Sequence, residues 1–131
     1  MNRNIRVPYG LSVHGNEEIR AVTKVLKSST QMGKNVSTFE KKISKLFDKR
    51  YGLMVNSGSS ALLIAMETLN FPPGSEIITP ALTFSTTVGY IVRNNWVPVF
   101  VDVEEGTYCI NEDKIKNLIT KKTKAVVAPH L

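Results

Sequence analysis

A turn of small polar residues runs directly into an apolar helix in the stretch NSGSSALLIAMETL, from Asn56 to Leu69. Gly58, Ser59 and Ser60 stand where that helix begins. The first amides of a helix have no partner within it, and its dipole favours an anion, so this turn could hold a phosphate group. Gly58 would let the backbone approach closely, and the two serines add hydroxyl donors. Either serine could equally serve only as a helix cap, and the turn alone leaves both interpretations open.

An aromatic side chain follows the next strand that the sequence predicts. The segment TPALTFSTT presents Phe84 shortly after the apolar stretch that ends at Thr79. Because the carboxyl ends of parallel strands share one edge of a sheet, Phe84 and the turn of Gly58 would meet there. The ring could stack on a planar ligand whose phosphate lies on the turn, although a lone phenylalanine at a helix start more often packs in a core.

Other chemistries lack their residue patterns. His14 and His130 lie far apart in the sequence, and no CxxC or HExxH spacing is present, so we expect no metal site. The turn is not GxSxG, which argues against a hydrolase nucleophile, and neither GxxxxGKS/T nor GxGxxG occurs. His130 could approach a cofactor or substrate at the edge of the sheet, but a structural role is the more ordinary interpretation.

The elements that must position these residues follow from the apolar pattern. Two amphipathic helices come first, one with Asn16 as its N-cap and one starting near Val36. We then predict strands at 51–55, 76–79, 97–101 and 124–128, alternating with helices at 59–69, 84–93 and after the cap residue Asn111. The helix 59–69 is apolar almost all round, which predicts that it is largely buried. The alternation predicts an α/β fold with a mostly parallel sheet and helices on both faces. Four segments should then converge at the carboxyl ends of the strands: 56–60, 80–84, 102–105 and 129–131.

Composition excludes several classes of partner. The chain has 131 residues, 42% hydrophobic and 21% charged, which is typical of one globular domain. No apolar run approaches the roughly 20 residues of a membrane span, and MNRNIRVPYG lacks the apolar region of a signal peptide. With one cysteine, Cys109, we expect a cytoplasmic protein. The net charge of +6 reflects lysines on amphipathic helices, which we interpret as solvated faces. We therefore expect no membrane partner and no nucleic acid, since no aromatic platform, zinc motif or Arg-rich arm is present.

Four ordered segments resemble one known family. NSGSSAL is similar to its Asn-x-Gly-Thr/Ser-x-Ala-Leu turn, and PPGSEIITPALTFSTT is similar to its Pro-Gly-Asp-Glu-Val-Ile segment with Thr-Phe/Trp. VPVFVDVEEGTYCIN and ITKKTKAVVAPHL resemble the two segments that follow. The resemblance extends from about Asn16 to Leu131, and it is to the DegT/DnrJ/EryC1/StrS sugar aminotransferases. These are pyridoxal 5'-phosphate enzymes with the aspartate aminotransferase fold.

The resemblance implies roles for individual residues. Gly58 and Ser59 would hold the cofactor phosphate, with Ser60 beside them, and Phe84 would stack on the pyridine ring. Asp102 occupies a recurrent family position without an assigned chemical step. The family's cofactor-bonding lysine and its ring-nitrogen aspartate are expected beyond Leu131, so no catalytic residue is assigned here and the chain alone is not expected to catalyse.

The resemblance also implies an organisation and an activity. Residues 1–35 would form an N-terminal arm and helix, and residues 36–131 the first part of an incomplete cofactor-binding large domain. The expected function is amino transfer to nucleotide-linked keto-deoxy sugars, with a donor such as glutamate, in lipopolysaccharide, cell-surface polysaccharide or deoxysugar biosynthesis. The expected assembly is a homodimer. A sugar 3-dehydratase of the same family, whose pattern GSSA and FSTTVGYIVRNNWVPVFVDV slightly favour, and a catalytically inactive interaction module remain open.

Overall fold

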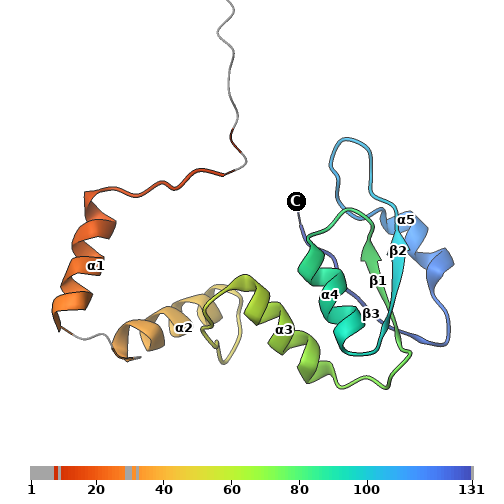
Figure 1. Cartoon of the computed structure of the whole chain (residues 1–131), viewed down its shortest axis with the longest axis horizontal. Coiled ribbons are helices and arrows are strands. Elements are labelled where there is room, and N and C mark those ends of the chain that lie inside the picture. Colours follow the sequence, from red (N-terminus) through yellow and green to blue (C-terminus); the bar gives the residue numbers. More distant parts are fainter. Residues whose placement is uncertain (1–7, 9, 29–30, 32, 131) are drawn as a thin grey trace, which may run out of the picture. The chain divides into compact units, whose positions relative to one another are not determined.

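The computed structural model describes residues 8, 10–28, 31 and 33–130, and these divide into two compact units, Met1–Gly52 and Leu53–Leu131. The first unit contains two helices, α1 (Asn16–Ser28) and α2 (Lys34–Leu46), as the sequence predicts. The second contains α3 (Gly58–Leu69), β1 (Glu76–Pro80), α4 (Ser85–Arg93), β2 (Val97–Val101), α5 (Glu112–Ile115), a 3-10 turn η1 (Lys116–Leu118) and β3 (Thr123–Val126) (Figure 1).

The cap of α1 lies one residue earlier than predicted. The carbonyl of Gly15 accepts the N–H of Ile19, and the N–H of Gly15 donates to Glu18 Oε2 at 2.7 Å. Gly15 therefore occupies the cap position, with the carboxylate of Glu18 folded back onto its amide as in a capping box. Asn16 is the first residue inside the helix.

The chain leaves α2 through a close backbone contact. After the helix, Asp48 adopts a left-handed conformation (φ 50°), and the N–H of Lys49 donates to the carbonyl of Ser44 at 2.7 Å. Gly52 then passes so near the helix that a Cβ there would lie 2.8 Å from the carbonyl oxygen of Glu40. Only glycine fits this crossing without a shift of backbone.

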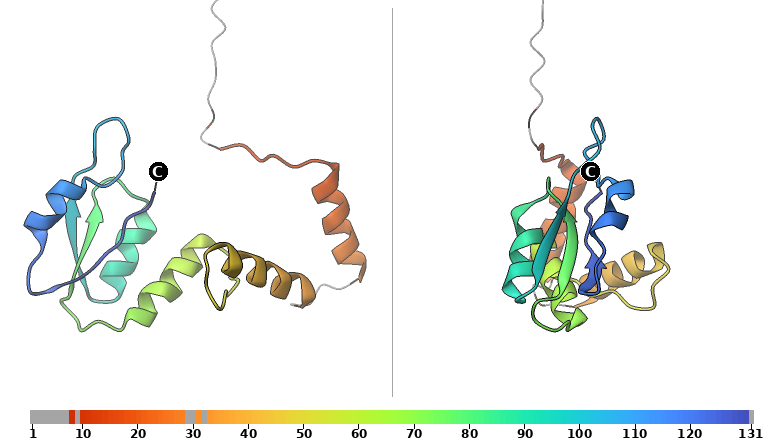
Figure 2. Two further views of the ribbon diagram at one scale, coloured as in Figure 1. Left: turned by 180° about the vertical axis from the view of Figure 1, so that it is seen from behind. Right: turned by 90° about the vertical axis from the view of Figure 1, so that its right-hand side faces the viewer.

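The sheet of the second unit is parallel, with strand order β2-β1-β3. Central strand β1 is buried from Ile77 to Pro80, which is typical of a parallel strand covered on both faces. Figure 1 shows α4 on one side of the sheet and α5 on the other, and the turned views of Figure 2 agree. The α/β fold with helices on both faces is therefore confirmed. Pro98 lies within β2, where an edge strand tolerates the missing N–H.

A compact core joins α3, α4 and the sheet. Met66, Ile77, Ile91 and Trp96 form its buried centre, and Leu62 and Phe71 pack against it. The indole N–H of Trp96 donates to the carbonyl of Phe71 at 3.1 Å, while the two rings lie 5.4 Å apart at a tilted angle of 49°. This core therefore fixes α3 and α4 against each other, and an Arg93–Glu67 ion pair at 3.7 Å joins their surfaces.

Two further sequence-based predictions are wrong. Residues 51–55 form no strand, and the described sheet consists of β2, β1 and β3 without this segment. The helix α3 is not largely buried: Met66 is its one buried residue, whereas Ile64 and Leu69 are 39% and 41% exposed. Apolar residues around the whole helix need cover on several sides, and among the described elements of its unit α3 has its main helix contact with α4.

Candidate functional site

Ser57, not Ser59 or Ser60, caps α3. Ser57 has extended backbone angles (φ −161°, ψ 159°), its Oγ accepts the N–H of Ser60 at 3.1 Å, and its carbonyl accepts the N–H of Ala61 at 3.0 Å. This is the usual geometry of a serine N-cap. The spacing Ser-x-x-Ser is a signal that the sequence interpretation missed when it considered the two later serines as caps.

A chain of hydroxyl groups stiffens the turn. The hydroxyl of Ser57 lies 3.0 Å from that of Ser60, which in turn donates to Asn56 Oδ1 at 2.6 Å. Both the amide and the hydroxyl of Ser60 are thus engaged inside the turn. Asn56 and Ser57, which the sequence interpretation did not single out, hold the loop that leads into the helix.

Gly58 and Ser59 present the free amides of the turn. In the described part of the chain, neither backbone N–H has a hydrogen-bond partner, as is expected for the first two residues of a helix. A Cβ added at Gly58 would have no other part of the described chain within 4 Å, and the φ of Gly58 is not left-handed. The fold itself therefore does not require glycine here. Two free amides, the Ser59 hydroxyl and the helix dipole together suit an anion.

Phe84 lies at the amino end of α4. It occupies the N-cap position with extended angles (φ −70°, ψ 141°), and its carbonyl accepts the N–H of Thr87 at 3.0 Å. Its side chain is 65% exposed, so the alternative of core packing is wrong for the described chain. Figure 1 shows α4 beginning at the end of the sheet toward which β1 runs, so Phe84 lies at the predicted edge. That the turn of Gly58 meets Phe84 at this edge stays a prediction.

Asp102 holds the loop that follows β2. Its Oδ2 accepts from Lys114 Nζ at 2.9 Å, its Oδ1 accepts the N–H of Val103 at 2.9 Å, and its carbonyl accepts the N–H of Asn111. The hydrogen bond from Lys114 lowers the pKa of the Asp102 carboxyl, and the N–H of Val103 lowers it further. Through these contacts Asp102 fixes the turn that follows β2.

The other residues predicted at the carboxyl edge of the sheet add no further group of functional side chains in the described chain. His130 is exposed at the end of the described chain, and its possible approach to a ligand stays a prediction. Across the residues that the structure describes, no three His, Cys, Asp or Glu side chains gather in a way that could hold a metal ion. None of the described helices is both long and apolar enough to cross a bilayer.

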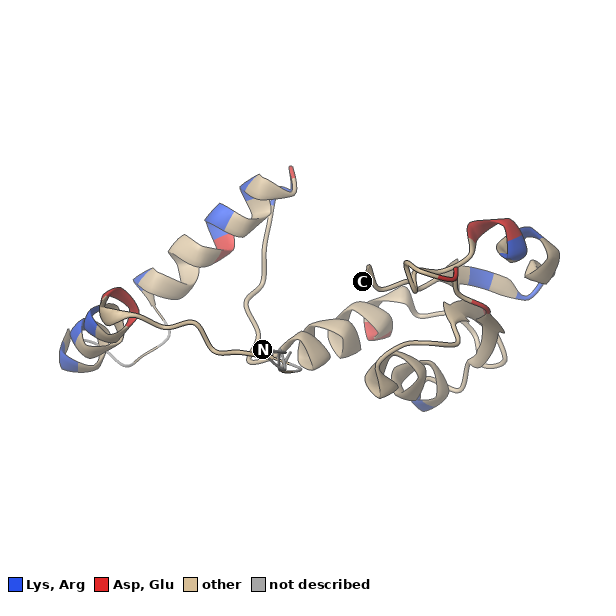
Figure 3. Cartoon of the chain, turned by 90° about the horizontal axis from the view of Figure 1, so that it is seen from above, with Lys and Arg blue, Asp and Glu red and all other residues tan. Residues whose placement is uncertain are grey.

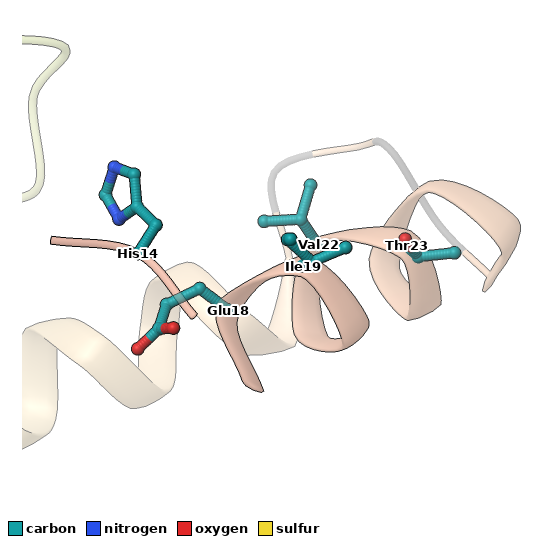
Figure 4. Close-up of a pocket in the computed structure, with 5 residues that line it drawn as sticks. All are labelled: His14, Glu18, Ile19, Val22 and Thr23. Atoms are coloured by element: carbon teal, nitrogen blue, oxygen red, sulfur yellow. The ribbon is translucent and has the colours of Figure 1, made fainter. Parts of the chain in front are cut away.

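A hollow also lies in the first unit. It has a volume of about 460 Å³ and is lined by His14 and by four residues of α1, Glu18, Ile19, Val22 and Thr23 (Figure 4). Figure 4 shows isoleucine and valine side chains along this helix, without a converging set of polar groups. The hollow is an open apolar surface and offers no donor set for an anion.

Charged residues are mixed rather than segregated. Figure 3 shows Lys and Arg on α1 and α2 interspersed with Asp and Glu, and more basic residues in the second unit near acidic ones. This pattern matches solvated helix faces better than a continuous basic stripe for nucleic acid.

Comparison with known proteins shows which family the chain is similar to. A profile of the DegT/DnrJ/EryC1/StrS aminotransferase family matches residues 13–131. The spore coat polysaccharide biosynthesis protein SpsC of Bacillus subtilis is 39% identical over 129 residues, which are 98% of this chain and 33% of that protein. The dTDP-4-dehydro-2,6-dideoxy-D-glucose 3-dehydratase of Saccharopolyspora spinosa is 38% identical, over 94% of this chain and 28% of that protein.

A solved structure gives the same result. The E. coli GDP-4-keto-6-deoxy-D-mannose-3-dehydratase, solved with bound hydrated PLP, superposes with a TM-score of 0.85 at 33% identity, over 95% of this chain and 34% of that one. The chain thus spans about a third of the length of these relatives. Matched along nearly all of its own length in both sequence and fold, the chain belongs to the DegT/DnrJ/EryC1/StrS aminotransferase family.

Proposed function

We propose that this chain supplies the phosphate-binding turn of a pyridoxal 5'-phosphate enzyme that acts on nucleotide-linked keto-deoxy sugars. The reaction is amino transfer from a donor such as glutamate, serving lipopolysaccharide, other cell-surface polysaccharide or deoxysugar biosynthesis. The observation that supports the proposal is the pair of free amides at Gly58 and Ser59, together with the exposed ring of Phe84 at the amino end of α4.

The residues present fit the cofactor in two respects. The phosphate of pyridoxal 5'-phosphate needs several N–H and O–H donors, which the amides of Gly58 and Ser59 and the Ser59 hydroxyl provide. Open space at Gly58 allows a phosphate to approach the backbone. The pyridine ring needs a flat apolar face, which an exposed phenylalanine provides. When bound, this cofactor supplies an electron sink next to the reacting amino group.

The residues of this chain would position the cofactor. Gly58 and Ser59 bind the phosphate, and the chain of bonds from Ser57 through Ser60 to Asn56 keeps their amides pointed outward before the ligand arrives. Such preorganisation lowers the entropy that is lost on binding. Phe84 covers one face of the ring and excludes water from it. No proton-transfer role falls on a described residue.

A 3-dehydratase of nucleotide-linked sugars is the second candidate. The relative from Saccharopolyspora spinosa and the superposed E. coli structure both carry that activity in their names. This chain would serve both reactions in the same way, because both need the cofactor phosphate bound and one face of its ring covered.

The proposal also includes partners and a location. The substrate is a nucleotide-linked sugar, the assembly is a homodimer, and the protein is cytoplasmic, as its single cysteine suggests.

Binding is tested best with a cofactor analogue that cannot react with surface lysines. Pyridoxine 5'-phosphate carries the phosphate and the ring but no aldehyde, and pyridoxine without phosphate is its matched control. Calorimetric titration of the chain should show saturable binding of the phosphorylated compound and at least tenfold weaker binding of the control. Equal binding of the two, or none of either, would overturn the phosphate role of the turn.

The reaction is tested separately on the protein that contains this chain. Incubation with a nucleotide-linked keto sugar and glutamate should yield an amino sugar if it is an aminotransferase. Loss of the 3-hydroxyl without nitrogen in the sugar product would select the dehydratase instead, and mass spectrometry separates the two.

A further inference from the structure

A hollow of about 290 Å³ lies at the amino end of the parallel sheet. It is bounded by the segment Pro72–Ser75, which precedes β1, and by Lys121, Lys122 and Lys124 at the start of β3. Because β1 and β3 are parallel, their amino ends meet here, away from the edge that carries the proposed cofactor site. The two sites therefore do not share residues.

The first wall of the hollow is rigid. Gly74 adopts a left-handed conformation (φ 78°), and its N–H donates to the carbonyl of Asn95 at 2.7 Å. The hydroxyl of Ser75 donates to the carbonyl of Pro72 at 2.7 Å, and Ser75 is only 4% exposed. The N–H of Val97 in turn donates to the carbonyl of Ser75, which ties this wall to β2.

The second wall is held equally firmly. The N–H of Thr120 donates to Thr123 Oγ1 at 2.9 Å, and the N–H of Lys122 donates to Thr120 Oγ1 at 3.0 Å. Both threonine hydroxyls donate to the same carboxylate oxygen of Glu76, and the N–H of Glu76 donates to the carbonyl of Lys122. The lysine backbone is thus positioned by a compact turn, and one oxygen of the nearby Glu76 carboxylate accepts from the two threonine hydroxyls.

The charge around the hollow is unbalanced. Three lysines line it and no acidic residue does. In the part of the chain that the structure describes, none of these three lysines has a carboxylate within 4 Å, whereas Lys114 and Arg93 do. Like charges grouped around a hollow repel one another, and an anion placed among them relieves that repulsion.

We propose that the hollow formed by Pro72–Ser75, Lys121, Lys122 and Lys124 binds a small phosphate-bearing anion. Its volume is at the lower end of small-molecule sites, which suits a diphosphate group better than a folded partner. Three ammonium groups match an anion of two or more charges, since lysine binds phosphate as a point charge. The diphosphate group could be free or part of a larger ligand. Titrations with inorganic diphosphate and with a nucleoside diphosphate distinguish these two sources.

The test is a titration of the full chain with inorganic diphosphate, followed by amide NMR. Shifts should saturate at residues 74–75 and 121–124. The double variant Lys122→Gln with Lys124→Gln should bind about fivefold to tenfold more weakly. The matched control, Lys42→Gln with Lys116→Gln, removes the same charge from exposed positions outside the hollow and should leave the affinity within twofold.

Three outcomes would overturn the proposal. Equal weakening by the control would show attraction to the net charge alone. Shifts confined to residues 58–60 would assign all binding to the cofactor turn, and the variant Gly58→Ala separates the two sites. A short single-stranded RNA that competes at much lower concentration than diphosphate would favour nucleic acid instead. A nucleoside diphosphate that binds more tightly than diphosphate would support the site and identify the larger source.

Discussion

Replacing Gly58 with alanine separates the needs of the fold from the needs of the ligand. Gly58 is the first residue of α3, its φ is not left-handed, and a Cβ there would meet no other part of the described chain within 4 Å. Alanine thus fits the folded backbone without strain. A bound phosphate, however, would have to share that space with the new methyl group.

The two expected effects have opposite signs. Alanine restricts the unfolded chain, so the free energy of unfolding should rise by about 0.4–1 kcal/mol. The methyl group should push the phosphate away from the amides of Gly58 and Ser59. Loss of one charge-assisted hydrogen bond costs about 1.5–3 kcal/mol, so the affinity for pyridoxine 5'-phosphate should fall roughly tenfold to a hundredfold.

Urea denaturation and calorimetric titration measure the two quantities on the same variant. The matched control is Gly89→Ala, an exposed glycine within α4 whose added Cβ also meets nothing within 4 Å. It should raise stability by about 1 kcal/mol and leave the ligand affinity unchanged. A Gly58→Ala chain that is less stable than the parent, or that binds the ligand as tightly, would refute the reasoning.

Three further substitutions probe the rest of the structure. Gly52→Ala should destabilise by about 1–3 kcal/mol in urea, because its Cβ would press on the Glu40 carbonyl; unchanged stability would contradict that close crossing. Met66→Ala should cost about 2–5 kcal/mol by emptying the core, and a smaller loss in thermal unfolding would show that the core collapses around the gap. The lowered pKa of Asp102 means that its contribution to stability is present above the unfolded pKa and is lost as pH falls through the folded one. Asp102→Asn should therefore reduce the loss of unfolding free energy at acid pH. An unchanged loss would show that the contact of Asp102 with Lys114 does not stabilise the fold.

Local chemistry allowed much of the fold to be predicted. The strand 97–101 and the helix α4 match their predicted ranges closely, because the apolar pattern of each element lies within its own residues. Asn111 caps α5 through its side chain, as predicted. These features depend on neighbours within a few residues, which a single sequence reveals.

The failures concern partners distant in sequence. Residues 51–55 have the apolar pattern of a strand, but a strand forms only when another strand lies beside it. The burial of α3 likewise depends on how many elements cover it, which its own residues do not encode. In the candidate site, the residue types of the turn predicted that it binds an anion. That Ser57 is the helix cap depends on backbone angles, which only the structure reveals.

The amides of Gly58 and Ser59 are proposed to bind the phosphate of the cofactor. The most direct measurement is the amide NMR spectrum of the chain during titration with pyridoxine 5'-phosphate and, separately, with pyridoxine. These two amide protons should show saturable downfield shifts with the phosphorylated compound only, because new hydrogen bonds form. Saturation of shifts elsewhere while the signals of Gly58 and Ser59 stay still would contradict it.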